Sequence, residues 1–174
     1  MHTGTVRHDL DPSRSSITIH ASSSIHPITT EAPVAGWIDV SLDSQGSVDP
    51  DAPVDGQVEF DLGGMRSGNP LIDREAERRL DIRRHPTVTG RLTALSPTAD
   101  GGYQGVGRLD FHGVTGALRG ELLVSVNADG ELVIEGTAEF DVTDFAVQPP
   151  SLLVIKVRPQ VRVELTAVAL PSPG

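Results

Sequence analysis

Apolar and polar residues alternate along most of this chain, and the last long segment shows the pattern most clearly. Between residues 153 and 169 the apolar side chains fall on odd positions, while charged or polar side chains fill most of the even positions. Neighbouring side chains of a β-strand point to opposite faces, so this segment has one apolar face and one face toward water. The segment is long for a sandwich strand but suits a tilted barrel strand, with Pro159 at a bend or an edge.

Shorter segments with the same alternation precede it, and turns rich in glycine, proline, asparagine and aspartate separate them. These expected strands span residues 16–22, 34–42, 57–62, 87–95, 103–111, 117–126 and 131–143. We expect a kink at residues 112–115 and a tight hairpin turn at Asp129-Gly130. About eight strands of this kind predict an all-β fold: an eight-stranded antiparallel lipocalin-like barrel that is wide enough for one small ligand or an elongated tail.

One segment in the middle of the chain has a different period. Asn69 can cap the first free amide groups of a helix, and Pro70 is compatible with the first helical position. A narrow apolar stripe follows, and His85-Pro86 is expected to end the helix. The stripe consists of Leu71, Ile72, Ala76 and Leu80, and it can extend to Ile82. The pattern predicts one inserted amphipathic helix near residues 70–84, lying across a mouth of the barrel.

Composition and charge narrow the classes of function. The length of 174 residues suits one domain over residues 1–174, with its core at about residues 6–170. The formal net charge of -10 argues against nucleic acid and anionic membrane surfaces as partners. The absence of cysteine excludes disulfides, thiolate nucleophiles and cysteine-based metal sites. Neither an apolar signal core at the amino terminus nor a run long enough to cross a bilayer is present, so we expect a cytoplasmic protein.

Several segments of the chain together resemble the YceI-like family, a lipocalin-like family described as polyisoprenoid binding. Residues 105–115 resemble a family strand that ends in a His-Gly-Val-Thr turn, and residues 67–86 resemble its helix and the following proline. Residues 140–145 resemble the segment before the last strand, and Ser15-Ser16-Ile17 resembles the opening strand. The resemblance implies a barrel around a hydrophobic pocket that binds a long isoprenoid lipid or related amphiphile without catalysis, and it makes a homodimer plausible.

The inward faces of the expected strands supply the candidate ligand-binding residues. They carry few aromatic side chains and several small ones, which suggests unfilled volume inside the barrel. The candidates are Val58, Phe60, Leu80, Val88, Leu109, Phe111, Leu122, Val124, Ile134, Phe140, Phe145, Leu153 and Ile155. Alternatively, the side chains fill the barrel, which would then be a structural or interaction module without a ligand.

The predicted helix is also rich in arginine, although the protein as a whole is acidic. One interpretation is that Arg74 and Arg78 lie at the mouth and meet a polar or phosphorylated head group. The other is that the helix is simply solvated, with its arginines paired to Glu75 and Glu77. The chain departs from the family pattern near this mouth, for example where Asp73-Arg74 reverses the family's Arg-Asp order.

Signals for catalysis, metals or cofactors are weak. No Gly-x-Ser-x-Gly motif occurs, and the Gly-x-Gly at residues 105–107 lacks the third glycine and the helix of a nucleotide-binding turn. His20 and His26 lack an obvious third ligand for a metal ion, and the ring of His112 is expected to bond backbone groups. We therefore expect a protein that is not an enzyme, with no metal and no cofactor other than a bound isoprenoid lipid or quinone. An enzyme would need acid–base groups that converge inside the barrel.

Overall fold

The computed structural model describes residues 4–173 except 26, 50, 150, 153 and 154, and it leaves the side chains of 151, 152 and 155 undescribed. Strands make up most of it, with one α-helix and two short 3-10 helices. In chain order the elements are β1 (Val6–Leu10), β2 (Ser16–Ser23), β3 (Pro27–Pro33), β4 (Ala35–Val40), β5 (Asp55–Asp61), η1 (Leu62–Gly64), α1 (Pro70–Leu80), β6 (Thr87–Pro97), β7 (Tyr103–Phe111), β8 (Val114–Val126), β9 (Leu132–Asp141), η2 (Val142–Phe145), β10 (Ser151–Leu152) and β11 (Ile155–Pro171).

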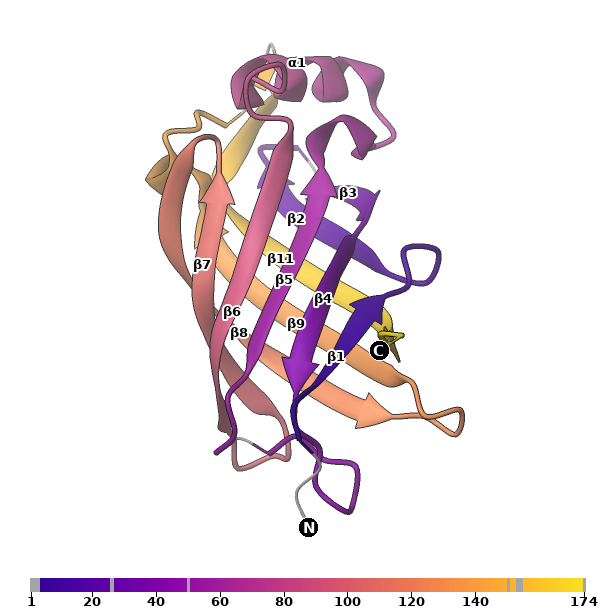
Figure 1. Ribbon diagram of the computed structural model, residues 1–174. Helices are drawn as coiled ribbons and strands as arrows, with labels where there is room; N and C mark the ends of the chain where they lie inside the picture. Colours follow the sequence, from indigo (N-terminus) through magenta and orange to yellow (C-terminus); the bar gives the residue numbers. More distant parts are fainter. Residues whose placement is uncertain (1–3, 26, 50, 150, 153–154, 174) are drawn as a thin grey trace.

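The strands form a closed antiparallel barrel (Figure 1). Hydrogen-bonded neighbours follow the order β1-β4-β5-β6-β7-β8-β9-β11, and β11 pairs with β1 to close the ring. Farther along β11, the strand β2 takes the place of β1, and β3 pairs with the other edge of β2. The predicted all-β, eight-stranded antiparallel barrel is confirmed.

The long last strand has the bend that its proline predicts. Its pairing with β2 shifts register between Val157 and Val161, on either side of Pro159. Proline cannot donate a backbone hydrogen bond to a neighbouring strand, so an irregularity at this position keeps the rest of the ladder intact. Beyond the shift, β11 pairs without interruption with β9 from Gln160 to Ala169.

Three strands, β1, β3 and the two-residue β10, were not expected from the sequence. The short strand β1 closes the barrel between β4 and β11, and β3 extends the sheet from β2. Among the described residues, β3 pairs with a strand along one edge only, which is the edge facing β2. Its other edge makes an isolated bridge between Glu31 and Arg66. The expected kink at residues 112–115 was also wrong in part. His112 and Gly113 form a tight turn with positive φ, whereas Val114 and Thr115 already belong to β8.

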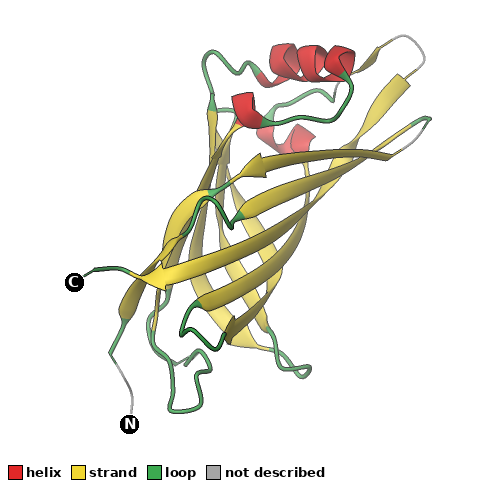
Figure 2. Cartoon of the chain, turned by 90° about the vertical axis from the view of Figure 1, so that its right-hand side faces the viewer, coloured by secondary structure: helices red, strands yellow, loops and turns green. Residues whose placement is uncertain are grey.

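The helix α1 lies across one end of the barrel (Figures 1 and 2). Its start agrees with the prediction, because the Asn69 side chain accepts hydrogen bonds from the amides of Leu71 and Ile72. Its end differs from the prediction of residue 84. Asp81 adopts the left-handed conformation, with φ of 49°, and its amide bonds to carbonyl oxygens of the preceding turn. This C-cap ends the helix at Leu80, before His85-Pro86 can do so.

Two clusters of buried side chains occupy the two ends of the barrel. The cluster far from α1, here called the lower cluster, contains the fully buried Leu132, Val34 and Val40. The hydroxyl of Tyr103 in this cluster donates a hydrogen bond to the main-chain oxygen of Val48. The lower cluster therefore closes this end of the barrel. The upper cluster, near α1, contains the buried rings of Phe111 and Phe145, which pack edge-to-face. The partly buried ring of Phe140 packs edge-to-face against both.

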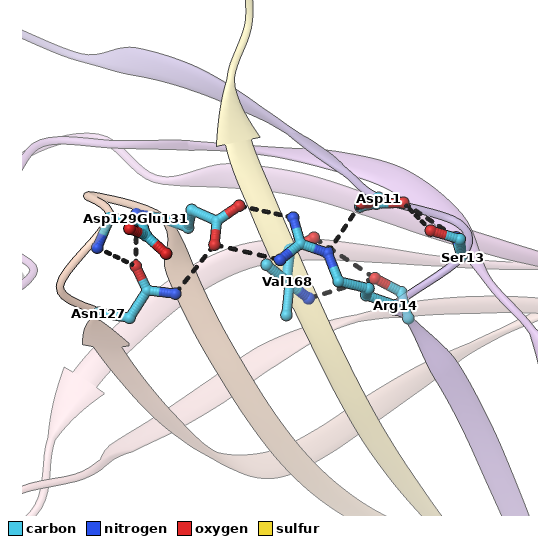
Figure 3. A network of polar contacts seen from close by, with 8 residues as sticks. Asp11, Ser13, Arg14, Asn127, Asp129, Glu131 and Val168 are labelled. Atoms are coloured by element: carbon cyan, nitrogen blue, oxygen red, sulfur yellow. Dashed lines mark hydrogen bonds and ion pairs between the residues drawn. The ribbon is translucent and has the colours of Figure 1, made fainter.

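A polar network ties together two turns at the closed end (Figure 3). Arg14, in the turn before β2, donates to both carboxylate oxygens of Glu131, the residue just before β9, and also to Asp11. Asn127 donates to Glu131 from the same hairpin turn. Arg14 and then Asn127 hold the pKa of the Glu131 carboxyl below its ordinary value. Hydrogen bonds from Ser13 and Arg14 likewise lower the pKa of Asp11.

We expect Glu131→Gln to lower the melting temperature at pH 7 by a few degrees and to have less effect near pH 3. A carboxyl whose pKa is lowered by folding stabilises the protein above its unfolded pKa, near 4, and this contribution is lost as pH falls through the folded value. Thermal unfolding of both proteins between pH 3 and pH 7 measures the difference. Asp129→Asn, in the same hairpin turn, is the control. A deficit that stays constant over this range would contradict the proposed role of the charge.

None of the helices among the described residues is both long enough and apolar enough to span a membrane.

Candidate ligand-binding cavity

A cavity of about 320 Å³ lies inside the barrel. Its wall is almost entirely apolar, and its volume falls near the lower end of the ~300–1,000 Å³ range of small-molecule pockets. The side chains of the barrel therefore do not fill it. A barrel with such a cavity differs from the alternative expected from the sequence, in which the side chains fill the interior.

Glycines at inward positions explain why the barrel is hollow. Gly56, Gly90 and Gly136 line the cavity from β5, β6 and β9, and each faces a leucine on the neighbouring strand. Protein interiors normally pack side chains closely, so a glycine in place of Val or Leu leaves an unfilled space. Gly105, Gly107 and Gly120 also line the cavity from β7 and β8. A β-carbon at Gly107 or Gly120 would meet a main-chain oxygen at 1.9 or 2.5 Å, so these two glycines allow close approach of the backbone and do not leave free volume. Glycines within alternating strands were thus a more direct sequence signal for a hollow interior than the scarcity of aromatic side chains.

Most of the predicted ligand-binding residues lie on the cavity wall. Those on the wall are Val58, Phe60, Leu80, Val88, Leu109, Phe111, Leu122, Ile134 and Phe140. Val124 and Phe145 do not line it: Val124 packs against the lower cluster, and Phe145 is buried in the upper cluster. Leu153 lies outside the described residues, as does the side chain of Ile155. Contact of these residues with a ligand stays a prediction.

The two predicted head-group arginines are not on the wall. The Arg78 side chain is 70% exposed and bonds to Glu75, and Arg74 is also exposed. Arg79 binds both Glu75 and Gln148 and so links α1 to the segment that precedes β10. Bonds from Arg78 and Arg79 lower the pKa of Glu75. These contacts fit the interpretation of paired, solvated arginines for Arg78 and Arg79.

The rotation of α1 about its axis explains this correction. The residues of α1 that line the cavity form one helical face. They are Ile72, Asp73, Ala76, Glu77 and Leu80. Leu71, which we expected on the apolar face, is 57% exposed. The rotation turns Arg74 and Arg78 away and brings Asp73 and Glu77 toward the cavity. The i, i+4 spacing of Asp73 and Glu77 beside Ile72 and Ala76 was the signal for this face.

Several polar residues of the wall lie at the end near α1, here called the mouth. Ser67, Asp73 and Glu77 approach from α1 and the loop before it, and Arg158 approaches from β11. Asp73 accepts hydrogen bonds from the amide and hydroxyl of Ser67, at 3.0 and 2.6 Å. The mouth thus combines hydrogen-bonding groups with a deep apolar interior.

The histidines lie elsewhere and form no metal site among the described residues. The ring nitrogen Nδ1 of His112 lies 3.1 Å from the main-chain oxygen of Phe145, in agreement with the backbone role predicted for it. His112 also packs edge-to-face on His85. His20 pairs with Glu164 on the outer face of the barrel, and His26 lies outside the described residues.

An eight-stranded antiparallel barrel around an apolar cavity is the architecture of lipocalin-like binding barrels. The sequence pattern of the YceI-like domain matches residues 8–169, and the chain belongs to this family. The resemblance noted in the sequence is thereby confirmed. No significant match is found among curated protein sequences.

Solved structures share the fold at low sequence identity. BcnA of Burkholderia cenocepacia superposes with a TM-score of 0.73 and 16% identity, covering 92% of this chain and 99% of that one. A polyisoprenoid binding domain of Saccharophagus degradans, implicated in plant cell wall breakdown, gives 0.70 and 14%, with 96% and 99% covered. The YCEI protein of Campylobacter jejuni gives 0.58 and 15%, with 80% and 82% covered. At these identities the likeness establishes the fold alone.

Proposed function

We propose that this protein binds, stores or carries an elongated apolar lipid inside its barrel, without catalysis. The ligand class is a polyisoprenoid, an isoprenoid quinone or a similar amphiphile. The observation that carries the proposal is the cavity of about 320 Å³, whose wall is almost entirely apolar. Membership of the YceI-like family and the likeness to a polyisoprenoid binding domain support it.

The physical basis of binding is the removal of apolar surface from water. Each methylene that enters the cavity contributes at most ~0.8 kcal/mol before the costs of ordering the chain. A five-carbon isoprene unit would therefore contribute a few kcal/mol, of order 3. Such binding has little directionality. The length of the cavity and the chemistry of the mouth would then determine which lipid is preferred.

The described groups at the mouth favour binding over catalysis. One carboxylate oxygen of Asp73 accepts both hydrogen bonds from Ser67, and Glu77 is exposed. Acid–base catalysis needs groups that converge on one reacting atom, and the described apolar interior offers no such set. The cytoplasmic location and the homodimer expected from the sequence both stay predictions.

Organic extraction of the purified protein followed by mass spectrometry tests the proposal, together with displacement of a fluorescent lipid. We expect one equivalent or less of a long-chain lipid in the extract, and saturable displacement by added polyisoprenoids. The same extraction of heat-unfolded, washed protein controls for lipid that adheres to the surface. An extract without lipid, combined with no saturable binding, would overturn the proposed function.

A further inference from the structure

The charged side chains at the mouth bear on which polar end the ligand carries. Asp73 and Glu77 face the cavity from the same side of α1, one helical turn apart. Arg158 is the cationic side chain that we assign to the mouth among the described residues. Among the charged side chains that line the mouth, two carboxylates thus stand beside one guanidinium. Arg74, which follows Asp73 in the sequence, is exposed and does not line the cavity.

Other charged residues that touch the wall do not change this balance. Arg91 occupies an outward position of β6 and binds Asp55 with two hydrogen bonds of 2.7 Å outside the barrel. Its main-chain oxygen lies beside Gly107, which explains why Arg91 counts among the wall residues. Glu121 alternates with the inward Gly120 and Leu122 on β8 and is exposed. Neither side chain is placed to meet a ligand at the mouth.

Arg78 and Arg79 do not pair with the two carboxylates. Arg78 and Arg79 bond to Glu75, on the side of the helix away from the cavity. Asp73 receives its described hydrogen bonds from Ser67, a neutral donor. The side chain of Glu77 makes no hydrogen bond or ion pair with another described residue. The mouth therefore offers free hydrogen-bond acceptors.

We propose that the mouth selects lipids whose polar end donates hydrogen bonds and carries no negative charge, as in an alcohol or an amine, and disfavours the same chain ending in phosphate. The inference rests on the proposed lipid-binding function and specifies its ligand class. A hydroxyl can donate to the carboxylate of Glu77 or Asp73. A phosphate monoester carries up to two negative charges and only acceptor oxygens when fully ionised, so the carboxylates repel it. Arg158 offsets part of this repulsion.

Competition between farnesol and farnesyl phosphate for a bound fluorescent lipid tests the inference, because the two probes share one hydrocarbon chain. Below their aggregation concentrations and at low salt, we expect farnesol to bind at least about tenfold more tightly. The ratio should shrink as salt is raised, since exposed charges are screened.

Glu77→Gln, alone and combined with Asp73→Asn, assigns the effect to the mouth. We expect each step to raise the affinity for farnesyl phosphate severalfold and to leave the affinity for farnesol within about twofold. Glu135→Gln, on the outer face of β9, changes the net charge equally and should leave the ratio unchanged. A circular dichroism spectrum checks that the Asp73→Asn variant is folded.

The outcomes separate the two proposals. Equal or tighter binding of farnesyl phosphate to the unmodified protein would overturn the inference and leave the lipid-binding function standing. A ratio that responds to Glu135→Gln as strongly as to Glu77→Gln would also overturn it. If neither probe displaces the fluorescent lipid, the lipid-binding function itself fails, and the inference fails with it.

Discussion

Replacement of Gly90 by isoleucine should weaken lipid binding at least about tenfold while the barrel stays folded. Gly90 lines the cavity from the middle of β6, and a β-carbon added there would meet only Val58 Cγ2, at 3.3 Å, within 4 Å. The remaining atoms of isoleucine would extend into the cavity and take up volume that the ligand needs. β-Branched residues suit strands, and removal of a strand glycine stabilises the folded chain by roughly 0.5–1 kcal/mol, which offsets the crowding of Val58.

We expect affinity for the fluorescent lipid to fall at least about tenfold, which corresponds to the loss of one or two buried methylenes. Titration measures this, and thermal unfolding checks the fold. Thr89→Val, one residue earlier on the outer face of β6, is the matched control and should bind like the unmodified protein. Full affinity in a folded Gly90→Ile protein would show that the ligand does not occupy this cavity.

Leu132→Ala should destabilise the barrel by about 2–5 kcal/mol, because it removes a large side chain from a close-packed site. Leu132 has 0% exposure in the lower cluster, and it does not line the cavity. The variant should therefore lose stability much more than ligand affinity. This is the reverse of the result expected for Gly90→Ile, so the two variants separate the closed end of the barrel from the binding region.

Urea unfolding of the Leu132→Ala protein gives the loss of stability, and lipid titration well below its melting temperature gives the affinity. Leu123→Ala, at a side chain that is 54% exposed on β8, is the control and should change stability by less than about 0.5 kcal/mol. A cost below 1 kcal/mol for Leu132→Ala would contradict the role of the lower cluster as a tightly packed closure.

The barrel could be predicted from the sequence because each long strand buries one face only. That arrangement imposes a period of two on the apolar residues, and β7 begins and ends at the expected residues, 103 and 111. The strands β1 and β3 escaped prediction for a physical reason. β1 has only five residues, and β3 begins and ends with proline and is paired mainly along one edge, so neither shows a long alternating pattern.

The mouth was harder to predict than the wall. Wall residues such as Phe60 and Val88 follow from strand alternation alone, whereas the side of α1 that faces the cavity depends on how the helix docks. A short helix with only Ile72 buried gives a weak rotational signal. The sequence therefore could not decide between an arginine face with Arg74 and Arg78 and an acidic face with Asp73 and Glu77. In the folded protein, α1 docks with Asp73 and Glu77 on the cavity side and with Arg74 and Arg78 off the cavity wall.

The side chains of the lower cluster close one end of the barrel, whereas Glu77 and Arg158 are exposed to solvent at the end near α1. If a ligand occupies this tube as proposed, the described residues leave it a route in and out past α1. An amphiphile must then enter tail first, and its polar end is the last part to leave water and the first to return. In the proposed carrier role, the α1 end would have to face the recipient, so this rim would set the direction of exchange.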